Sequence, residues 1–345
     1  MGREDQLIRK LALSVPSVIG PRGSRRSPRA GVRLGIGDDA AVVVPGRNTD
    51  LIVTCDAFLE GVHFLADRHP ADSVGYKSLA RATSDIAAMG AKPRFFLLTL
   101  ALPQSRTGKW LSGFLRGMRR AARELGVRLI GGDTTRYPSV LISITVFGEV
   151  ASGRAITRAG ARPGDILYVT GSLGQAQLGL EIIRNCPLSE VKRVIRSQNR
   201  LLRQHLYPRI RMRLGEWLAK HRIASSMIDI SDGLSTDLGH LCAASGVGAQ
   251  VWAERIPHVE IPAAQFKFAR RRRLDPLEMA LHGGDAYDLL FTVPRRLAKS
   301  LRSAPEFQDI SAIGEIERGK QILLVDSDGR AKPLKPGGWD PFRRL

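Results

Sequence analysis

The sequence is poor in cysteine and aromatic residues and contains no long apolar run. Its 345 residues include only three cysteines, Cys55, Cys186 and Cys242, which lie far apart and form no Cys-x-x-Cys pair, so neither a disulfide framework nor a zinc site is predicted. The longest apolar run, residues 95–102, is far shorter than the about 20 residues of a membrane span. The chain opens with charged residues rather than a signal-peptide core. We therefore expect a soluble, cytoplasmic protein with no membrane partner.

Acidic residues are too few to balance the basic ones. Lys and Arg number 53 against 33 Asp and Glu, which gives a net charge of +20. One hypothesis is a nucleic-acid-binding protein whose basic segments, such as residues 20–33 and 267–273, neutralise phosphates. Aromatic residues that could stack on bases make up only 6% of the chain, and no known nucleic-acid-binding module is recognisable. This hypothesis stays an alternative of a different class, and we do not expect nucleic acid as the main partner.

Apolar strands alternate with amphipathic helices along most of the chain, which predicts an α/β (α+β) fold. A turn-rich stretch at residues 151–165 divides it into an N-terminal domain, 1–150, and a C-terminal α/β domain, 151–345. Strands are predicted at 51–58, 94–102, 127–131, 140–150, 166–171, 227–231, 248–253, 287–293, 310–316 and 321–326. Helices are predicted at 74–89, 110–125, 173–185, 196–220, 232–245 and 295–303.

The most informative pattern is a series of aspartates beside Gly, Ser or Thr, at the ends of the predicted strands. In α/β folds, ligand sites form at strand ends, and carboxylates gathered there favour a hard cation. Magnesium, which takes oxygen ligands together with substrate phosphates, suits them better than zinc, because no Cys/His cluster is present. Any single one could instead be a helix cap or turn residue. The series comprises Asp38, Asp39, Asp56, Asp85, Asp133, Asp229 and Asp232.

Several common catalytic motifs are missing from the chain. There is no P-loop, no protein-kinase catalytic loop, no Gly-x-Ser-x-Gly elbow and no His-Glu-x-x-His pair. The segment 35–40, GIGDDA, fits a loose dinucleotide fingerprint, but its two carboxylates would repel a pyrophosphate. His63 could contact a substrate or be a surface or core histidine, and Trp339 could plug the core or stack on a planar ligand. Covalent catalysis is not predicted.

A set of motifs in the same order along residues 34–342 resembles the thiamine-monophosphate kinase family, within the ATP-dependent superfamily typified by aminoimidazole ribonucleotide synthetase. The motifs are GIGDDAAVV, DAFLEGVHF, SDIAAMGAKP, GGDTTR, RAITRAGARPGD, VTGSLG, DISDGLSTDLGHL, SGVGA and ALHGGDAYDLLFTV. The resemblance implies an N-terminal domain whose sheet pairs with that of a second copy into a dimeric β-barrel. It also implies a C-terminal α/β domain and an active site between the two domains.

The reaction that the resemblance implies is transfer of the ATP γ-phosphoryl group to thiamine monophosphate, with several Mg²⁺ ions. Because no nucleophile is recognisable, we predict direct in-line transfer without a phosphoenzyme. By resemblance, the catalytic residues are Asp85, Asp133 and Asp229; the ATP-binding residues are Gly132, Asp133, Arg158 and Ser231; the substrate-binding residues are His63, Asp285 and Trp339; and the metal-binding residues are Asp39, Thr54, Cys55, Asp56, Asp85, Asp133, Asp229 and Asp232.

Three positions differ from the pattern usual in this family. Asp285 and Ala286 stand where the family has Glu and Asp, and Cys55 stands in place of a threonine. The difference at Asp285 and Ala286 falls in the predicted binding site of the phosphoryl acceptor. An enzyme of the same superfamily with a different acceptor is therefore the alternative reading.

Overall fold

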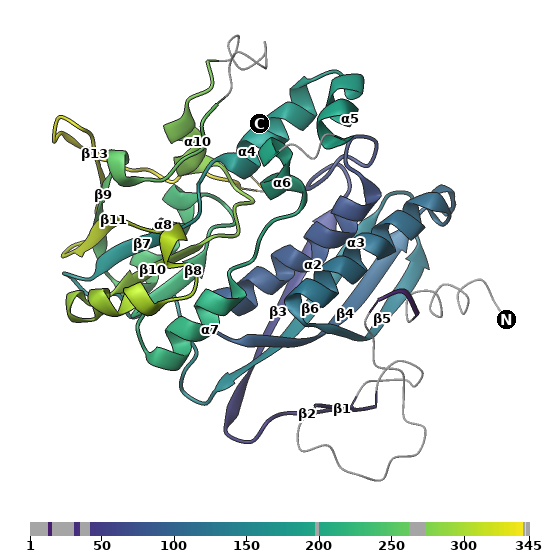
Figure 1. Cartoon of the computed structure of the whole chain (residues 1–345), viewed down its shortest axis with the longest axis horizontal. Coiled ribbons are helices and arrows are strands. Elements are labelled where there is room, and N and C mark those ends of the chain that lie inside the picture. The colour runs from purple at the N-terminus through teal and green to yellow at the C-terminus, as the bar shows by residue number, and fades with distance from the viewer. Residues whose placement is uncertain are drawn as a thin grey trace. The chain divides into compact units, whose positions relative to one another are not determined.

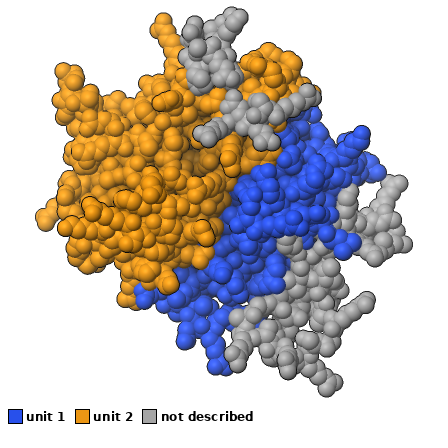
Figure 2. Space-filling view, viewed as in Figure 1, with its two compact units in different colours: residues 1–86, 91–155 blue, residues 87–90, 156–345 orange. Residues whose placement is uncertain are grey.

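The computed structural model describes residues 13–15, 31–34, 42–196, 200–261, 273–340 and 342. The chain divides into two compact units, coloured separately in Figure 2: Met1–Ile86 with Ala91–Ala155, and Ala87–Gly90 with Ile156–Leu345. Within the described ranges, no helix is both long and apolar enough to cross a membrane. Two of the predicted aspartates, Asp38 and Asp39, lie outside the described residues.

The first unit is built on a four-stranded sheet in the order β3-β6-β4-β5. β3 and β4 each pair antiparallel with β6, while β5 pairs parallel with β4, which requires the helical crossover between them. The helices α2 and α3 lie over one face of the sheet (Figure 1). The elements are β3 (Thr49–Leu59), α2 (Ala71–Ala88), β4 (Lys92–Leu102), η1 (Gln104–Arg106), α3 (Lys109–Leu125), β5 (Arg128–Arg136) and β6 (Leu141–Ala151), with a separate strand pair, β1 (Gly31–Leu34) and β2 (Val42–Val44).

The two helices of the first unit pack closely because glycines stand where they meet. A Cβ atom on Gly75 of α2 would lie 1.9 Å from the carbonyl oxygen of Phe114 in α3. One on Gly117 of α3 would lie 1.7 Å from the carbonyl oxygen of Asp72 in α2. The apolar stripe of the helix predicted at 110–125 is core packing, since Phe114 and Met118 are fully buried.

The second unit is built on a seven-stranded mixed sheet in the order β13-β12-β9-β11-β7-β10-β8. The sheet and α8 enclose a core that includes Leu167, Leu238 and Leu290. A second core lies among α4, α5 and α6 and includes Leu178, Val191 and Leu202. The elements are β7 (Ile166–Thr170), α4 (Gln175–Asn185), α5 (Leu188–Arg196), α6 (Arg200–Leu206), α7 (Met212–His221), β8 (Ser226–Asp229), α8 (Leu234–Ser245), β9 (Gly248–Trp252), η2 (Ala253–Arg255), α10 (Pro276–His282), β10 (Leu289–Val293), η3 (Arg295–Ser303), η4 (Phe307–Asp309), β11 (Ile310–Glu317), β12 (Ile322–Val325) and β13 (Ala331–Pro333).

The prediction of a single helix over 196–220 is wrong. The structure ends α6 at Leu206 and begins α7 at Met212. Pro208 lies between them; it has no N–H to donate and disfavours helical backbone at the residue before it. The sequence prediction also missed the helices α5 and α10. The predicted strands from 51–58 to 321–326 are confirmed, with ends shifted by a few residues.

Candidate functional site

The first unit places three of the predicted metal ligands, Thr54, Asp56 and Asp85, between β3 and α2. Thr54 and Asp56 are two residues apart and lie on the same face of β3, and Arg81 and Asp85 are one turn apart on α2. Thr54 Oγ1 donates to Asp85 Oδ2 at 2.5 Å. Arg81 Nε donates to Asp56 Oδ2 at 3.0 Å. Both carboxylates thus lie at one contact between strand and helix, and an arginine contacts one of them.

The prediction that these aspartates stand at strand ends is only partly right. Asp229 is the last residue of β8, as predicted. Asp56 and Asp133, however, lie inside β3 and β5, and Asp85 lies in α2. The reason is that ladder pairing extends past these residues: β3 pairs with β6 over its whole length, and β5 with β4 through Arg136.

Asp133 and Gly132 lie at the far edge of the same sheet from β3. Asp56 of β3 pairs with a residue of β6, that residue pairs with one of β4, and the latter pairs with Gly132 of β5. Gly132 and Asp56 are therefore three strand spacings apart, or about 14 Å. The next residue, Asp133, is exposed and shares the opposite face of the sheet with Cys55, whose Sγ lies 3.5 Å from Ser143 Oγ. Within one chain, the first unit therefore brings Asp56 and Asp85 together and holds Asp133 and Cys55 apart from them.

His63 is fixed in the turn that follows β3. Its Nδ1 accepts the backbone N–H of Leu59 at 3.0 Å, and its ring lies against Phe58 with 5.6 Å between the ring centroids. A neutral ring that accepts at Nδ1 carries its proton on Nε2. The imidazole therefore has a defined orientation and is half-exposed.

The second unit gathers four predicted site residues where three loops meet. The N–H of Asp285 donates to the carbonyl oxygen of Ser231 at 2.8 Å. The N–H of Trp339 donates to the carbonyl oxygen of Asp232 at 2.9 Å, and Trp339 is 44% exposed. Asp229, which is buried, ends β8 just before them. Residues far apart in the sequence thus form one cluster at the end of the sheet.

The prediction missed Asp237, a buried residue in the first turn of α8. Its Oδ2 accepts the N–H groups of Asp232 and Gly233 at 3.1 and 3.0 Å. Burial and the negative charges of Asp229 and Asp232 raise the pKa of Asp237 to about 8. Ligand atoms of Asp232, Asp237 and His240 lie within 4.8 Å of one another. An acidic residue four positions after the glycine of the Asp-Gly pair was the available signal in the sequence.

Arg158 belongs to the segment that leads into the second unit. Its carbonyl oxygen accepts the Ser245 hydroxyl at 3.0 Å, and that hydroxyl also accepts the N–H groups of Gly160 and Ala161 at 3.1 Å. The backbone is therefore tied to the end of α8, while the Arg158 residue remains exposed. An exposed guanidinium on an anchored backbone suits contact with phosphate oxygens.

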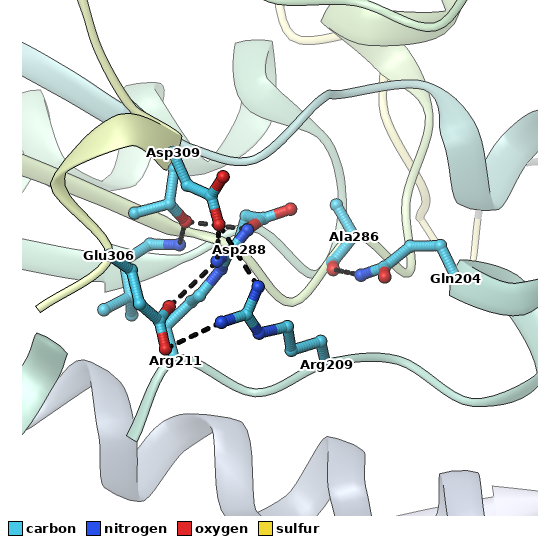
Figure 3. A network of polar contacts seen from close by, with 9 residues as sticks. Gln204, Arg209, Arg211, Ala286, Asp288, Glu306 and Asp309 are labelled. Carbon is cyan, nitrogen blue, oxygen red and sulfur yellow. Dashed lines mark hydrogen bonds and ion pairs between the residues drawn. The ribbon is translucent and has the colours of Figure 1, made fainter. Parts of the chain in front are cut away.

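A separate ionic network is buried beside this cluster (Figure 3). Arg211 donates to Asp288 at 2.9 Å, to Glu306 at 2.9 Å and to Asp309 at 2.8 Å. Burial alone would lower the pKa of Arg211, but the three carboxylates outweigh it and raise that pKa above its ordinary value. Arg209, which is more exposed, pairs with Glu306 and Asp309. The two arginines offset most of the negative charge of these three carboxylates within the protein.

Comparisons with known proteins define the class of protein to which this fold belongs. The chain matches the family of AIR synthase related proteins over residues 37–150, for the N-terminal domain, and 162–326, for the C-terminal domain. It has the two-domain α/β fold of that class, with two mixed sheets. Structures of the hydrogenase maturation protein HypE share the fold, at 20% identity and a TM-score of 0.70 for the Escherichia coli protein.

Relatives with higher sequence identity indicate one family within this class. The thiamine-monophosphate kinase of Escherichia coli strain K12 is 38% identical over 92% of this chain and 94% of its own length, and that of Salmonella typhimurium is 40% identical over the same shares. The crystal structure of the Stenotrophomonas maltophilia enzyme aligns over 95% of this chain and 96% of its own, with a TM-score of 0.74 and 34% identity. The structure of AaThiL complexed with AMPPCP and TMP covers 99% of both chains, with a TM-score of 0.72 and 27% identity. This chain belongs to the thiamine-monophosphate kinase family.

Proposed function

We propose that this chain transfers the γ-phosphoryl group of ATP to thiamine monophosphate, giving thiamine diphosphate and ADP. The observation that carries the proposal is similarity along nearly the whole length to thiamine-monophosphate kinases, one of them complexed with AMPPCP and TMP. The clustering of Ser231, Asp232, Asp285 and Trp339 supports it, because all four were predicted as ATP, metal or substrate contacts.

The carboxylates of this chain fit the binding of magnesium. Their oxygen atoms are the ligands that Mg²⁺ prefers. In the second unit, the charges of Asp229 and Asp232 raise the pKa of Asp237, and a divalent cation would relieve that repulsion. Asp56 and Asp85 would hold metal in the first unit, with Thr54 beside them, and Asp229 and Asp232 in the second. The resemblance adds Asp39, Asp133 and an oxygen of Cys55, although Asp133 and Cys55 lie apart from Asp56 and Asp85 within one chain. Bound magnesium supplies positive charge that offsets the negative charge of the phosphates.

The proposed transfer is direct and in line, without a phosphoenzyme. The phosphate of the acceptor is anionic near neutral pH, so the main barrier is repulsion between two anions rather than removal of a proton. Arg158 would pair with phosphate oxygens, while His63, Asp285 and Trp339 would bind the thiamine part of the acceptor. After mixing with γ-labelled ATP alone, we expect no label on the protein; trapped phosphoprotein would contradict direct transfer.

The open face of the first sheet supports a homodimer. Leu51 and Val53 of β3 point away from the helices and are 42% and 53% exposed. Phe147 of β6, in register with Val53, lies half-buried on the same face. A second copy packed on this face would bury these side chains, and closing the two sheets into a barrel would also cover the outer strands β3 and β5.

Light scattering after size exclusion tests the dimer. We expect Val53→Lys to shift the wild-type dimer towards monomer, because the ammonium group would be buried in the interface. Leu188→Lys, at a similarly apolar exposed position of the second unit, should leave the dimer intact. A monomeric wild-type chain, or equal effects of the two variants, would contradict the proposal.

The activity is tested by incubating the purified chain with ATP, Mg²⁺ and thiamine monophosphate and separating the thiamine phosphates by chromatography. We expect thiamine diphosphate from the wild type and a loss of about 10²–10³-fold in kcat for Asp85→Asn. Asp326→Asn is the matched control, because Asp326 accepts backbone N–H groups in a turn near the C-terminus. If Mg²⁺-dependent ATP binding occurs without thiamine diphosphate formation, the acceptor is a different one.

A further inference from the structure

The segment that joins α10 to β10 has a backbone conformation that its residue types disfavour. Asp285 has a φ of 63° and Tyr287 a φ of 53°, both in the left-handed region. Aspartate tolerates this region better than most residues, and an aromatic residue tolerates it poorly. Such strain persists only where the surroundings impose it, and it is concentrated at functional sites.

Hydrogen bonds from two sides impose this conformation. The N–H groups of Asp285 and Tyr287 donate to carbonyl oxygens of the residues that follow β8, both at 2.8 Å. Between them, the carbonyl oxygen of Ala286 accepts Gln204 Nε2 of α6 at 2.7 Å (Figure 3). The three consecutive residues are thus held by one loop and one helix.

The end of the segment nearer β10 is fixed by the buried ionic network. Asp288 Oδ1 accepts the Thr170 hydroxyl at 2.7 Å and Arg211 Nε at 2.9 Å. Asp288 is only 3% exposed, so this end cannot move without exposing a buried ion pair. The backbone of the whole segment is therefore rigid.

On this backbone, the side chains of Asp285 and Tyr287 meet. Tyr287 Oη donates to Asp285 Oδ1 at 2.6 Å. The other carboxylate oxygen, Oδ2, lies 4.0 Å from Nδ1 of His205. Tyr287 and His205 are almost completely buried, whereas the Asp285 side chain is 30% exposed. Tyr287 thus binds the carboxylate from the protein interior, with His205 close by, and the rest of the carboxylate is exposed to solvent.

Resting on the proposed function, we propose that Tyr287 is a positioning residue for the acceptor. Its hydroxyl holds the Asp285 carboxylate in one orientation, in which it meets the positively charged thiazolium ring or the amino group of thiamine monophosphate. A carboxylate held in its binding orientation loses no side-chain entropy when the ligand arrives, so the affinity for the acceptor increases. The effect acts through Asp285 and is confined to the acceptor, leaving ATP binding unchanged.

The test is Tyr287→Phe, which removes the hydroxyl and keeps the buried ring. We expect both the KM and the calorimetric Kd for thiamine monophosphate to rise about tenfold, the effect of losing one hydrogen bond to a charged group. The KM for ATP and kcat should stay within about twofold, because the reacting phosphates are not touched. Tyr168→Phe is the control, since Tyr168 lies on β7 of the same sheet and stacks on Phe291.

A double-variant cycle separates positioning from a structural role. In an Asp285→Ala background, Tyr287→Phe should cause no further rise in the KM for thiamine monophosphate. Additive effects, an unchanged KM in the single variant, or loss of folding by circular dichroism would each overturn the inference. A wild-type chain that binds ATP but neither binds nor phosphorylates thiamine monophosphate overturns the proposed function, and this inference with it.

Discussion

Two groups of carboxylates lie next to each other in the second unit, and the fold gives them different partners. Asp229 ends β8, and it pairs in register with Leu289, the residue that follows Asp288. Asp288 is neutralised by the buried Arg211, which also binds Glu306 and Asp309 (Figure 3). Asp237 instead accepts hydrogen bonds from two backbone N–H groups, and the negative charges of Asp229 and Asp232 repel its carboxylate.

In the second unit, the difference separates carboxylates that serve the fold from those that we propose to bind metal. A buried carboxylate whose charge is balanced by an arginine inside the protein serves the fold. Burial and the charges of Asp229 and Asp232 raise the pKa of Asp237, which costs stability, and groups perturbed in this way cluster at functional sites. Aspartate at a strand end is common to both groups, so within the second unit the partner, and not the residue type, distinguishes them.

Arg211→Met should produce the largest change, because it leaves Asp288 buried without its cation. We expect the free energy of unfolding of the second unit to fall by about 3–5 kcal/mol. Arg209→Met removes an arginine that contacts Glu306 and Asp309 from a more exposed position, and should cost at most about 1 kcal/mol. Urea unfolding of both variants checks this, and equal losses would contradict the structural role of Arg211.

Asp229→Asn should affect activity rather than stability. We expect kcat to fall about 10²–10³-fold, equivalent to about 3–4 kcal/mol of transition-state stabilisation. The urea midpoint should not fall, since one of the like charges around Asp237 is removed. Asp328→Asn, at an exposed turn, is the control for both measurements. A stability loss as large as that of Arg211→Met would place Asp229 among the structural carboxylates.

Asp237→Asn should stabilise the protein when divalent cations are absent. The Asn oxygen can still accept the two N–H groups, but it carries no charge. The pKa of Asp237 is raised from 3.8 to about 8, so the free energy of unfolding of the wild-type protein falls as pH rises through that interval. The gain from Asn should therefore grow from pH 4 to about 8, reach at least about 1 kcal/mol, and then level off. Thermal unfolding at several pH values checks this, and a pH-independent gain would refute it.

Arg81→Met extends the comparison to the first unit, with the smallest effect. Without Mg²⁺ we expect a loss of about 1 kcal/mol, because the pair with Asp56 is partly exposed. Added Mg²⁺ should reduce the difference from wild type, since a metal at Asp56 supplies the lost charge. Arg81→Lys keeps a charge there and should behave almost as wild type. A Mg²⁺-independent loss in thermal shift assays would remove Asp56 from the metal site.

Local pattern was enough to predict most of the secondary structure and to place several of the proposed site residues on their elements. Alternating apolar residues predicted the strands, and the stripe through Phe114 and Met118 predicted a core helix. Asp229 could be placed at a strand end because Gly and Ser follow the apolar run. The α6–α7 break could also have been predicted, because Pro208 is a local signal.

The partner of each carboxylate was not predictable. Arg81 is 25 positions from Asp56, and Arg211 is 77 from Asp288, so no sequence period links them. The same holds for the contact of Ser231 with Asp285 and for the burial and repulsion that raise the pKa of Asp237.

The sequence by itself determined which residue types are available and which element carries each one, because propensity and periodicity act over a few residues. Only the tertiary structure decided which aspartates meet arginine and which meet other aspartates. The physical reason is that Coulomb energy depends on distance in space and on burial, and both are set by the packing of the sheets and helices.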